Sequence, residues 1–141
     1  MKILVIDGKG GGIGKAVVER LCREKQDYSI MAAGTNAIAT SAMHKAGADQ
    51  SATGENAVVY NCGRVDVIIG SIGIVLANSM LGEITPRIAE AVSSSEAVKI
   101  LIPTSKCNAL ITGLRDLPTA QYIDEIPEIL KLCRDPGRGD T

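Results

Sequence analysis

The sequence contains no phenylalanine and no tryptophan, and tyrosine occurs only three times in 141 residues. A hydrophobic core must therefore be built from isoleucine, leucine, valine and alanine, which suits a parallel sheet covered by helices. The scarcity of aromatic side chains also removes the platforms on which nucleic-acid bases stack. Fifteen basic residues against sixteen acidic ones leave no positive surplus for a phosphate backbone. We therefore expect no nucleic-acid partner.

Histidine and closely spaced cysteines are equally scarce. His44 is the only histidine, and none of the four cysteines forms a C-x-x-C pair or has a histidine beside it: Cys22, Cys62, Cys107 and Cys133. This spacing predicts neither a metal site nor a disulfide framework, and free thiols are typical of a reducing cytoplasm. A signal peptide and an apolar run of membrane-spanning length are not expected either. We therefore predict a cytoplasmic protein that does not insert into a membrane.

The length of the chain suits one domain with a single buried core. Apolar runs of strand length alternate with stretches in which apolar residues recur at helical spacing. The predicted strands cover residues 2–7, in the centre of the sheet, 28–33, 65–69, 99–102 and 108–114. This pattern predicts an α/β fold, a three-layer, Rossmann-like, doubly wound domain with a mostly parallel sheet of about five strands. We expect the domain to span residues 1–133, and residues 134–141 to form a flexible tail.

Three stretches between these strands are harder to assign. Residues 50–54 are predicted as a loop. Residues 55–62 fit either a short helix or a strand, and we favour the helix because the alternation of strands and crossovers demands one. The apolar stretch 72–81 lacks polar alternation and indicates a buried helix or a helix-like loop.

Capping residues mark several helix boundaries. Thr35 or Asn36 can cap the helix that follows the second strand. Thr85, with a proline directly after it, is a strong start signal for another helix. Proline is tolerated in the first turn of a helix and is costly in its interior. Because the last helix contains Pro127, we predict that it starts near Asp124.

Five glycines follow the first strand at positions 8, 10, 11, 12 and 14. Between a strand and a helix, glycines let a phosphate approach the backbone, and the first-turn N–H groups of the helix point at it. The spacing G-x-x-x-G-x-G resembles the phosphate-binding turn of the short-chain dehydrogenases, over residues 3 to 22 only. Neither G-x-G-x-x-G nor the P-loop fits, because Ile13 and Ala16 occupy required positions. A turn without a ligand is the alternative, although one or two glycines suffice for that.

Polar and small residues also end the other strands of the predicted sheet. Doubly wound sheets bind ligands outside the carboxyl ends of their strands, so we expect these residues to share one site. The candidate binding residues are Asp7, Gly8, Gly10, Gly11, Gly12, Ile13, Gly14, Thr35, Asn36, Gly70 and Ser71. The predicted ligand is a nucleotide or another phosphorylated small molecule, and NAD(P) is one possibility. No metal is predicted there.

An NAD(P)-dependent oxidoreductase is the first alternative to a binding protein. The resemblance to short-chain dehydrogenases implies a tyrosine with a lysine four residues later, and none of the three tyrosines has one. An acidic residue for the ribose hydroxyls is expected about 20 positions after the glycines, where Gly34-Thr35-Asn36 stands. A small phosphoryl- or acyl-handling enzyme that uses Cys107 or Glu55 is the second alternative. We therefore predict a binding module and assign no catalytic residue.

Two further expectations concern partners and family. The apolar stretch 72–81 carries more apolar surface than one small domain readily buries, which favours a homo-oligomer. Four stretches resemble a family of small bacterial proteins known only as a domain of unknown function: Ile6-Asp7-Gly8-x-Gly-Gly-Gly-Ile-Gly-Lys15, and residues 34–43, 53–56 and 77–86. This resemblance implies no activity.

Overall fold

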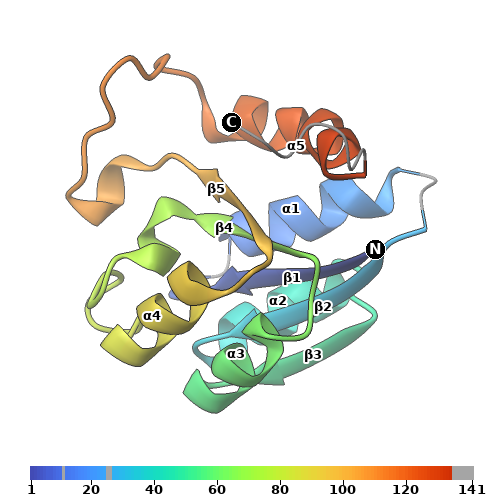
Figure 1. Ribbon diagram of the computed structural model, residues 1–141, viewed down its shortest axis with the longest axis horizontal. Helices are drawn as coiled ribbons and strands as arrows, with labels where there is room; N and C mark the ends of the chain where they lie inside the picture. Colours follow the sequence, from blue (N-terminus) through green and yellow to red (C-terminus); the bar gives the residue numbers. More distant parts are fainter. Residues whose placement is uncertain (11, 25–26, 135–141) are drawn as a thin grey trace.

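The computed structural model describes residues 1–10, 12–24 and 27–134, and Figure 1 shows strands and helices alternating along them. The strands are β1 (Lys2–Asp7), β2 (Ser29–Gly34), β3 (Gln50–Thr53), β4 (Val67–Ser71) and β5 (Val98–Ile102). The α-helices are α1 (Gly12–Cys22), α2 (Ala37–Lys45), α3 (Glu55–Cys62), α4 (Pro86–Ser94) and α5 (Thr119–Cys133). Two short 3-10 helices are η1 (Ile72–Val75) and η2 (Ser105–Cys107). Of the predicted tail, residues 135–141 lie outside the described residues.

The five strands form one parallel sheet in the order β3-β2-β1-β4-β5. The strand β1 is central, as predicted, and it pairs with β2 along its whole length, from Lys2 opposite Ser29 to Asp7 opposite Gly34. The order of strands reverses between β1 and β4, and doubly wound sheets bind ligands at such a switch point. The predicted doubly wound α/β fold is confirmed.

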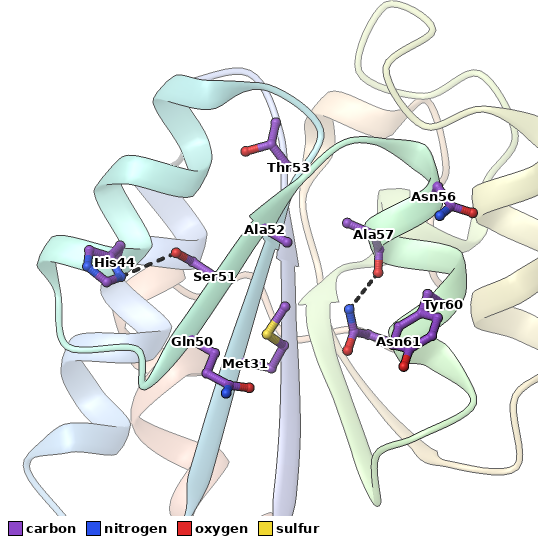
Figure 2. A pocket seen from close by; sticks show the side chains of 10 residues that line it. All are labelled: Met31, His44, Gln50, Ser51, Ala52, Thr53, Asn56, Ala57, Tyr60 and Asn61. Atoms are coloured by element: carbon purple, nitrogen blue, oxygen red, sulfur yellow. Dashed lines mark hydrogen bonds between the residues drawn. The ribbon is translucent and has the colours of Figure 1, made fainter.

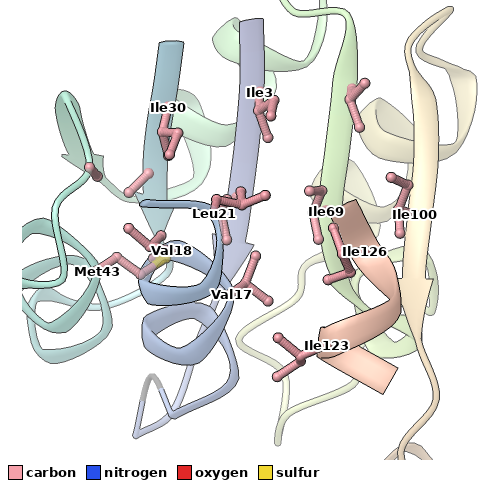
Figure 3. Close-up of a cluster of buried hydrophobic side chains, with 14 of the residues drawn as sticks. Ile3, Val17, Val18, Leu21, Ile30, Met43, Ile69, Ile100, Ile123 and Ile126 are labelled. Atoms are coloured by element: carbon pink, nitrogen blue, oxygen red, sulfur yellow. The ribbon is translucent and has the colours of Figure 1, made fainter. Parts of the chain in front are cut away.

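Helices cover both faces of the sheet, because successive strand side chains point to opposite sides. On β1, Ile3 and Val5 belong to a core cluster with side chains of α1, α2 and α5, and Figure 3 shows this cluster. Leu4 and Ile6 belong to a second cluster, with side chains of α3, α4 and η1. All four side chains are at most 1% exposed. None of the helices in the described ranges is long and apolar enough to cross a membrane.

Two segments were assigned wrongly, one predicted as a loop and one as a strand. The predicted loop at 50–54 contains β3, which is held by its pairing with β2. The predicted strand at 108–114 does not form, and this segment connects η2 to α5 instead. Its backbone cannot stay extended, because Asn108 and Gly113 have φ angles of 54° and 76°, in the left-handed region. The side chain of Leu110 is 99% exposed, so it does not pack the segment against the sheet.

Most helix predictions were right. Residues 55–62 form a helix, and 72–81 combines η1 with consecutive turns. Asn36 caps α2 by accepting a hydrogen bond from the Ala39 N–H at 2.9 Å, and Thr85 caps α4. The start of α5 was predicted too late: the helix begins at Thr119, with Pro127 in its interior. Burial of α5 against the first core cluster offsets the backbone hydrogen bond that this proline cannot donate.

Candidate functional site

The carboxyl ends of β1, β2 and β4 meet at one edge of the sheet. Asp7 lies opposite Gly34 in the β1–β2 register, and the Thr35 N–H donates to the Asp7 carbonyl at 3.0 Å. The β1–β4 register pairs Val5 with Ile69. Asp7 and Ser71 each follow this pair by two residues and are the last residues of the two neighbouring strands. The strand ends that the sequence predicted as one site are therefore brought together.

The carboxylate of Asp7 closes the turn between β1 and α1. One oxygen accepts from the Gly8 N–H at 2.8 Å and the other from the Gly14 N–H at 2.6 Å. Burial raises the pKa of Asp7, the N–H groups of Gly14 and Gly8 lower it, and the charge of Glu83 raises it further. The Gly14 N–H, which we expected to face a phosphate, is thus occupied by a carboxylate of the chain itself.

The glycines of the turn divide into two kinds. A Cβ on Gly8 would lie 2.6 Å from the Thr35 hydroxyl, and one on Gly14 would lie 2.7 Å from the Asp7 Cβ. Both glycines are therefore required by close packing. A Cβ on Gly10 or Gly12 would meet no atom within 4 Å, so these two face open space. Gly11 lies outside the described residues.

Two further N–H groups, those of Gly12 and Ile13, lie in the first turn of α1. Among the described residues, the N–H groups of Gly12 and Ile13 have no hydrogen-bond acceptor. The positive end of the helix dipole lies at the same place and favours an anion there. No residue of the first turn of α1 is itself acidic, and within that turn the Asp7 carboxylate bonds to the Gly14 N–H only.

Glu83 lies against the glycine turn, and it was expected at the rim of an oligomer interface and not among the binding residues. Its Oε1 accepts from the Thr35 hydroxyl at 2.8 Å and from the Asn36 side-chain amide at 2.7 Å. The Lys9 N–H donates to both carboxylate oxygens at 3.2 Å. The hydrogen bond from Asn36 is the main cause that lowers the pKa of Glu83, with further lowering by Thr35 and Lys9. The only sequence signal was its position inside the family-like stretch 77–86.

Ser71 ends β4 with a buried hydroxyl. Its side chain is 3% exposed, and its Oγ has no hydrogen-bond partner among the described residues. Such a group costs free energy unless a water or ligand satisfies it. The neighbouring Gly70 has a packing role, because a Cβ there would lie 2.9 Å from the Ile6 carbonyl oxygen. Ser71 therefore stays a candidate binding residue, and Gly70 positions it.

A separate hollow lies at the outer edge of β3, beside α3 (Figure 2). In it the Ser51 hydroxyl is 3.2 Å from Nδ1 of His44, and the Asn61 amide donates to the Ala57 carbonyl at 2.7 Å. None of the lining residues belongs to the predicted site. Among the described residues, no Asp, Glu, Lys or Arg lines this hollow, whereas the carboxylates of Asp7 and Glu83 lie at the glycine turn.

Glu55 and Cys107, the residues considered for a phosphoryl- or acyl-handling enzyme, contact residues outside the predicted binding site. Glu55 begins α3, accepts from the Thr85 hydroxyl at 2.7 Å and lies 3.8 Å from the Arg87 guanidinium. Cys107 lies in η2, where its thiol contacts the Thr104 carbonyl at 3.2 Å. Within the described ranges, no three histidine, cysteine, aspartate or glutamate residues are grouped so that they could hold a metal ion.

The fold and the site define a doubly wound α/β protein with a glycine-rich turn at its switch point. The chain belongs to the family described as Domain of unknown function (DUF3842), whose model matches residues 2–134. No curated protein matches the chain. A solved structure with some likeness is the dodecameric FMN-dependent UbiX-like decarboxylase from Escherichia coli O157:H7, at 17% identity and a TM-score of 0.45, over 100% of this chain and 86% of that one. A likeness at this level says nothing about the cofactor or assembly of this chain.

Proposed function

We propose that the protein binds a nucleotide or another phosphorylated small molecule at the carboxyl edge of its sheet, beside the glycine turn. One observation carries this proposal. Donors from Lys9, Thr35 and Asn36 converge on a single anionic position, which the Glu83 carboxylate fills. Oxygens of a phosphate accept hydrogen bonds from the same kinds of donor.

The unpaired groups nearby support the same proposal. The N–H groups of Gly12 and Ile13 lack acceptors among the described residues, and the open space at Gly12 leaves room for a ligand atom. The buried Ser71 hydroxyl offers a further polar contact at the neighbouring strand end. None of these contacts requires a proton shuttle, so we propose binding and assign no reaction.

A thermal-shift panel of NAD, NADP, ATP, GTP, FMN and sugar phosphates tests the proposal. A ligand at one hundred times its dissociation constant stabilises the native state by about 2.7 kcal/mol. In a domain of this size that raises the Tm by several degrees, roughly 2–4 °C per kcal/mol. The proposal is rejected if none of these compounds shifts the wild type or a variant with a neutral residue at position 83.

Two glycine variants locate the site. Gly12→Val places a side chain in front of the first-turn N–H groups of α1 and should abolish the shift. Gly63→Val is the matched control, because Gly63 also faces open space with φ at −91° and ends α3. It should keep the full shift. A shift that survives in a folded Gly12→Val variant would place the ligand elsewhere.

We also propose that the chain forms a homo-oligomer. The predicted interface at 72–81 has little apolar surface to offer, because Ile74 is fully buried and Leu81, 91% exposed, is the one large hydrophobic side chain of this stretch that is exposed. The segment between η2 and α5 is the better candidate. Leu110, Ile111 and Leu114 are 99%, 43% and 43% exposed in it, and it runs along the outside of the molecule (Figure 1).

A further inference from the structure

Glu83 is carried by a segment with an unusual backbone. Residues 76–84 connect η1 to α4 through consecutive turns. Asn78, Met80 and Leu81 have φ angles of 66°, 56° and 56°, which residues with a side chain rarely adopt. Such a conformation persists only where surrounding contacts hold it, and it is common in segments that switch. Leu81 supplies little of that support, because its side chain is 91% exposed.

The segment is held by hydrogen bonds of its own turns, by the buried side chain of Ile84 and by contacts with the glycine turn. The Glu83 carboxylate takes its hydrogen bonds from Lys9, Thr35 and Asn36. Met80 also reaches the turn, since a Cβ on Gly8 would lie 2.9 Å from its sulfur. At the base of the segment, the Asn78 N–H donates to the Ile84 carbonyl at 2.7 Å, which keeps the loop compact.

We propose that Glu83 is an internal substitute for the anionic group of the ligand, so that ligand binding displaces Glu83 and opens the segment 78–83. This inference rests on the proposed function. Two anions cannot share the same three donors, so each must exclude the other. The charged groups that face Glu83 are the ammonium of Lys9 and the carboxylate of Asp7. The Asp7 charge adds to the repulsion that an incoming anion meets while Glu83 is in place.

This arrangement sets the apparent affinity of the site. If a ligand binds only the open form, its apparent dissociation constant equals its intrinsic dissociation constant divided by the fraction of molecules that are open. Removing the negative charge at position 83 weakens the closed form, because hydrogen bonds to a charged group are stronger than those to a neutral one. The affinity for an anionic ligand should therefore rise, although a contact of the native protein has been weakened.

Binding of ATP and of inorganic pyrophosphate to the full chain tests the proposal, with three variants. Glu83→Gln should bind about tenfold more tightly than the wild type. Gly82→Ala should also bind more tightly, since Gly82 has φ at 91° in the closed segment and alanine disfavours that angle. This variant leaves Glu83 and its donors untouched, so it serves even if Glu83→Gln does not fold. Glu90→Gln, an exposed change on α4, is the control and should bind like the wild type.

Hydrogen exchange gives a second readout on the wild type. Saturation with ATP or pyrophosphate should slow exchange at Gly12 and Ile13, whose N–H groups would bind the ligand, and speed it at 78–83, because the segment leaves the turn. Equal affinity in wild type, Glu83→Gln and Gly82→Ala, or slower exchange at 78–83, would overturn the displacement and leave the proposed function standing. Failure of both probes to bind any of these proteins would reject the site for these ligands, and the displacement with it.

Discussion

The carboxylate of Asp7 accepts a hydrogen bond from the Gly14 N–H, seven positions further along the chain, at 2.6 Å. The last residue of β1 thereby fixes the first turn of α1. The Glu83 carboxylate accepts hydrogen bonds from Lys9, Thr35 and Asn36. Two carboxylates of the protein itself therefore occupy donors at and beside the glycine turn. Asp7 is buried and structural, whereas Glu83 belongs to the loop whose opening we propose.

We expect Asp7→Ala to destabilise the protein by about 2 kcal/mol, because it leaves the N–H groups of Gly8 and Gly14 without their acceptor in a buried place. Urea unfolding measures this. Asp124→Ala is the control, since the ion pair of Asp124 with Arg20 is on the surface, with its side chain 63% exposed. It should cost less than about 1 kcal/mol. Equal losses in the two variants would contradict the structural role of Asp7.

The same two carboxylates should give opposite pH dependences of stability. The folded pKa of Glu83 is lowered from the ordinary value of 4.5, so its contribution is present above 4.5 and is lost as the pH falls through the folded pKa. The folded pKa of Asp7 is raised from 3.8, so the part of its contribution that depends on protonation is present below 3.8 and is lost as the pH rises through the folded pKa. Its hydrogen bonds with the Gly8 and Gly14 N–H groups are counted separately from this part. The difference in free energy of unfolding between wild type and Glu83→Gln should shrink on acidification.

The corresponding difference for Asp7→Asn should grow on acidification. Urea unfolding of the three proteins at several pH values between 3 and 6 provides the comparison, with the wild type as the common reference. If the two differences in free energy of unfolding changed in the same direction with pH, one of the two carboxylates would be in a different environment from the one described.

The strands that the sequence predicted are those with a continuous apolar run. The buried run of β1 indicates a central strand covered on both faces. The strand β3 has the sequence Gln50-Ser51-Ala52-Thr53, and its side chains are only partly buried at the sheet edge. Its pairing with β2 uses backbone groups, which leave no pattern in the sequence. The apolar residues at 108–114 have a strand-like pattern, but none of the strands that the structure describes pairs with them.

The candidate site was predictable only where it lies close to the glycines. A strand followed by a glycine-rich turn and a helix indicates the edge at which Asp7, Thr35 and Ser71 meet. Glu83 was missed because it lies 47 positions from Asn36, and a single glutamate in a loop carries no periodic signal. Its role depends on where the segment 76–84 folds back, which is decided by tertiary packing and not by local sequence.

Alanine at two glycines of the turn should have contrasting effects on stability. Gly14→Ala places a Cβ 2.7 Å from both the Asp7 Cβ and the Met43 sulfur, and overpacking of this kind costs about 1–3 kcal/mol. Gly12→Ala meets no atom within 4 Å and gains helix propensity, so it should be neutral or slightly stabilising. Urea unfolding at neutral pH compares them. A stable Gly14→Ala variant would show that the contact of α1 with β1 is looser than described.

The last prediction concerns self-association through the segment 108–118. Only its C-terminal part is tied to α5, where the Tyr122 hydroxyl accepts from the Leu117 N–H at 3.1 Å and donates to the Arg115 carbonyl. The apolar side chains before Arg115 are exposed to solvent in the single chain, and contact with a second copy would bury them. Sedimentation velocity at micromolar concentration should therefore give a multiple of 14.7 kDa.

Replacing both Leu110 and Ile111 by serine should shift the mass to that of one chain without lowering the free energy of unfolding of the monomer, because these side chains are exposed. Leu132→Ser is the matched control: its side chain is 53% exposed on α5, and the variant should keep the wild-type mass. A wild type that sediments as one chain rejects self-association. An oligomer that survives the double substitution but is lost in Leu132→Ser would move the interface from this segment to α5.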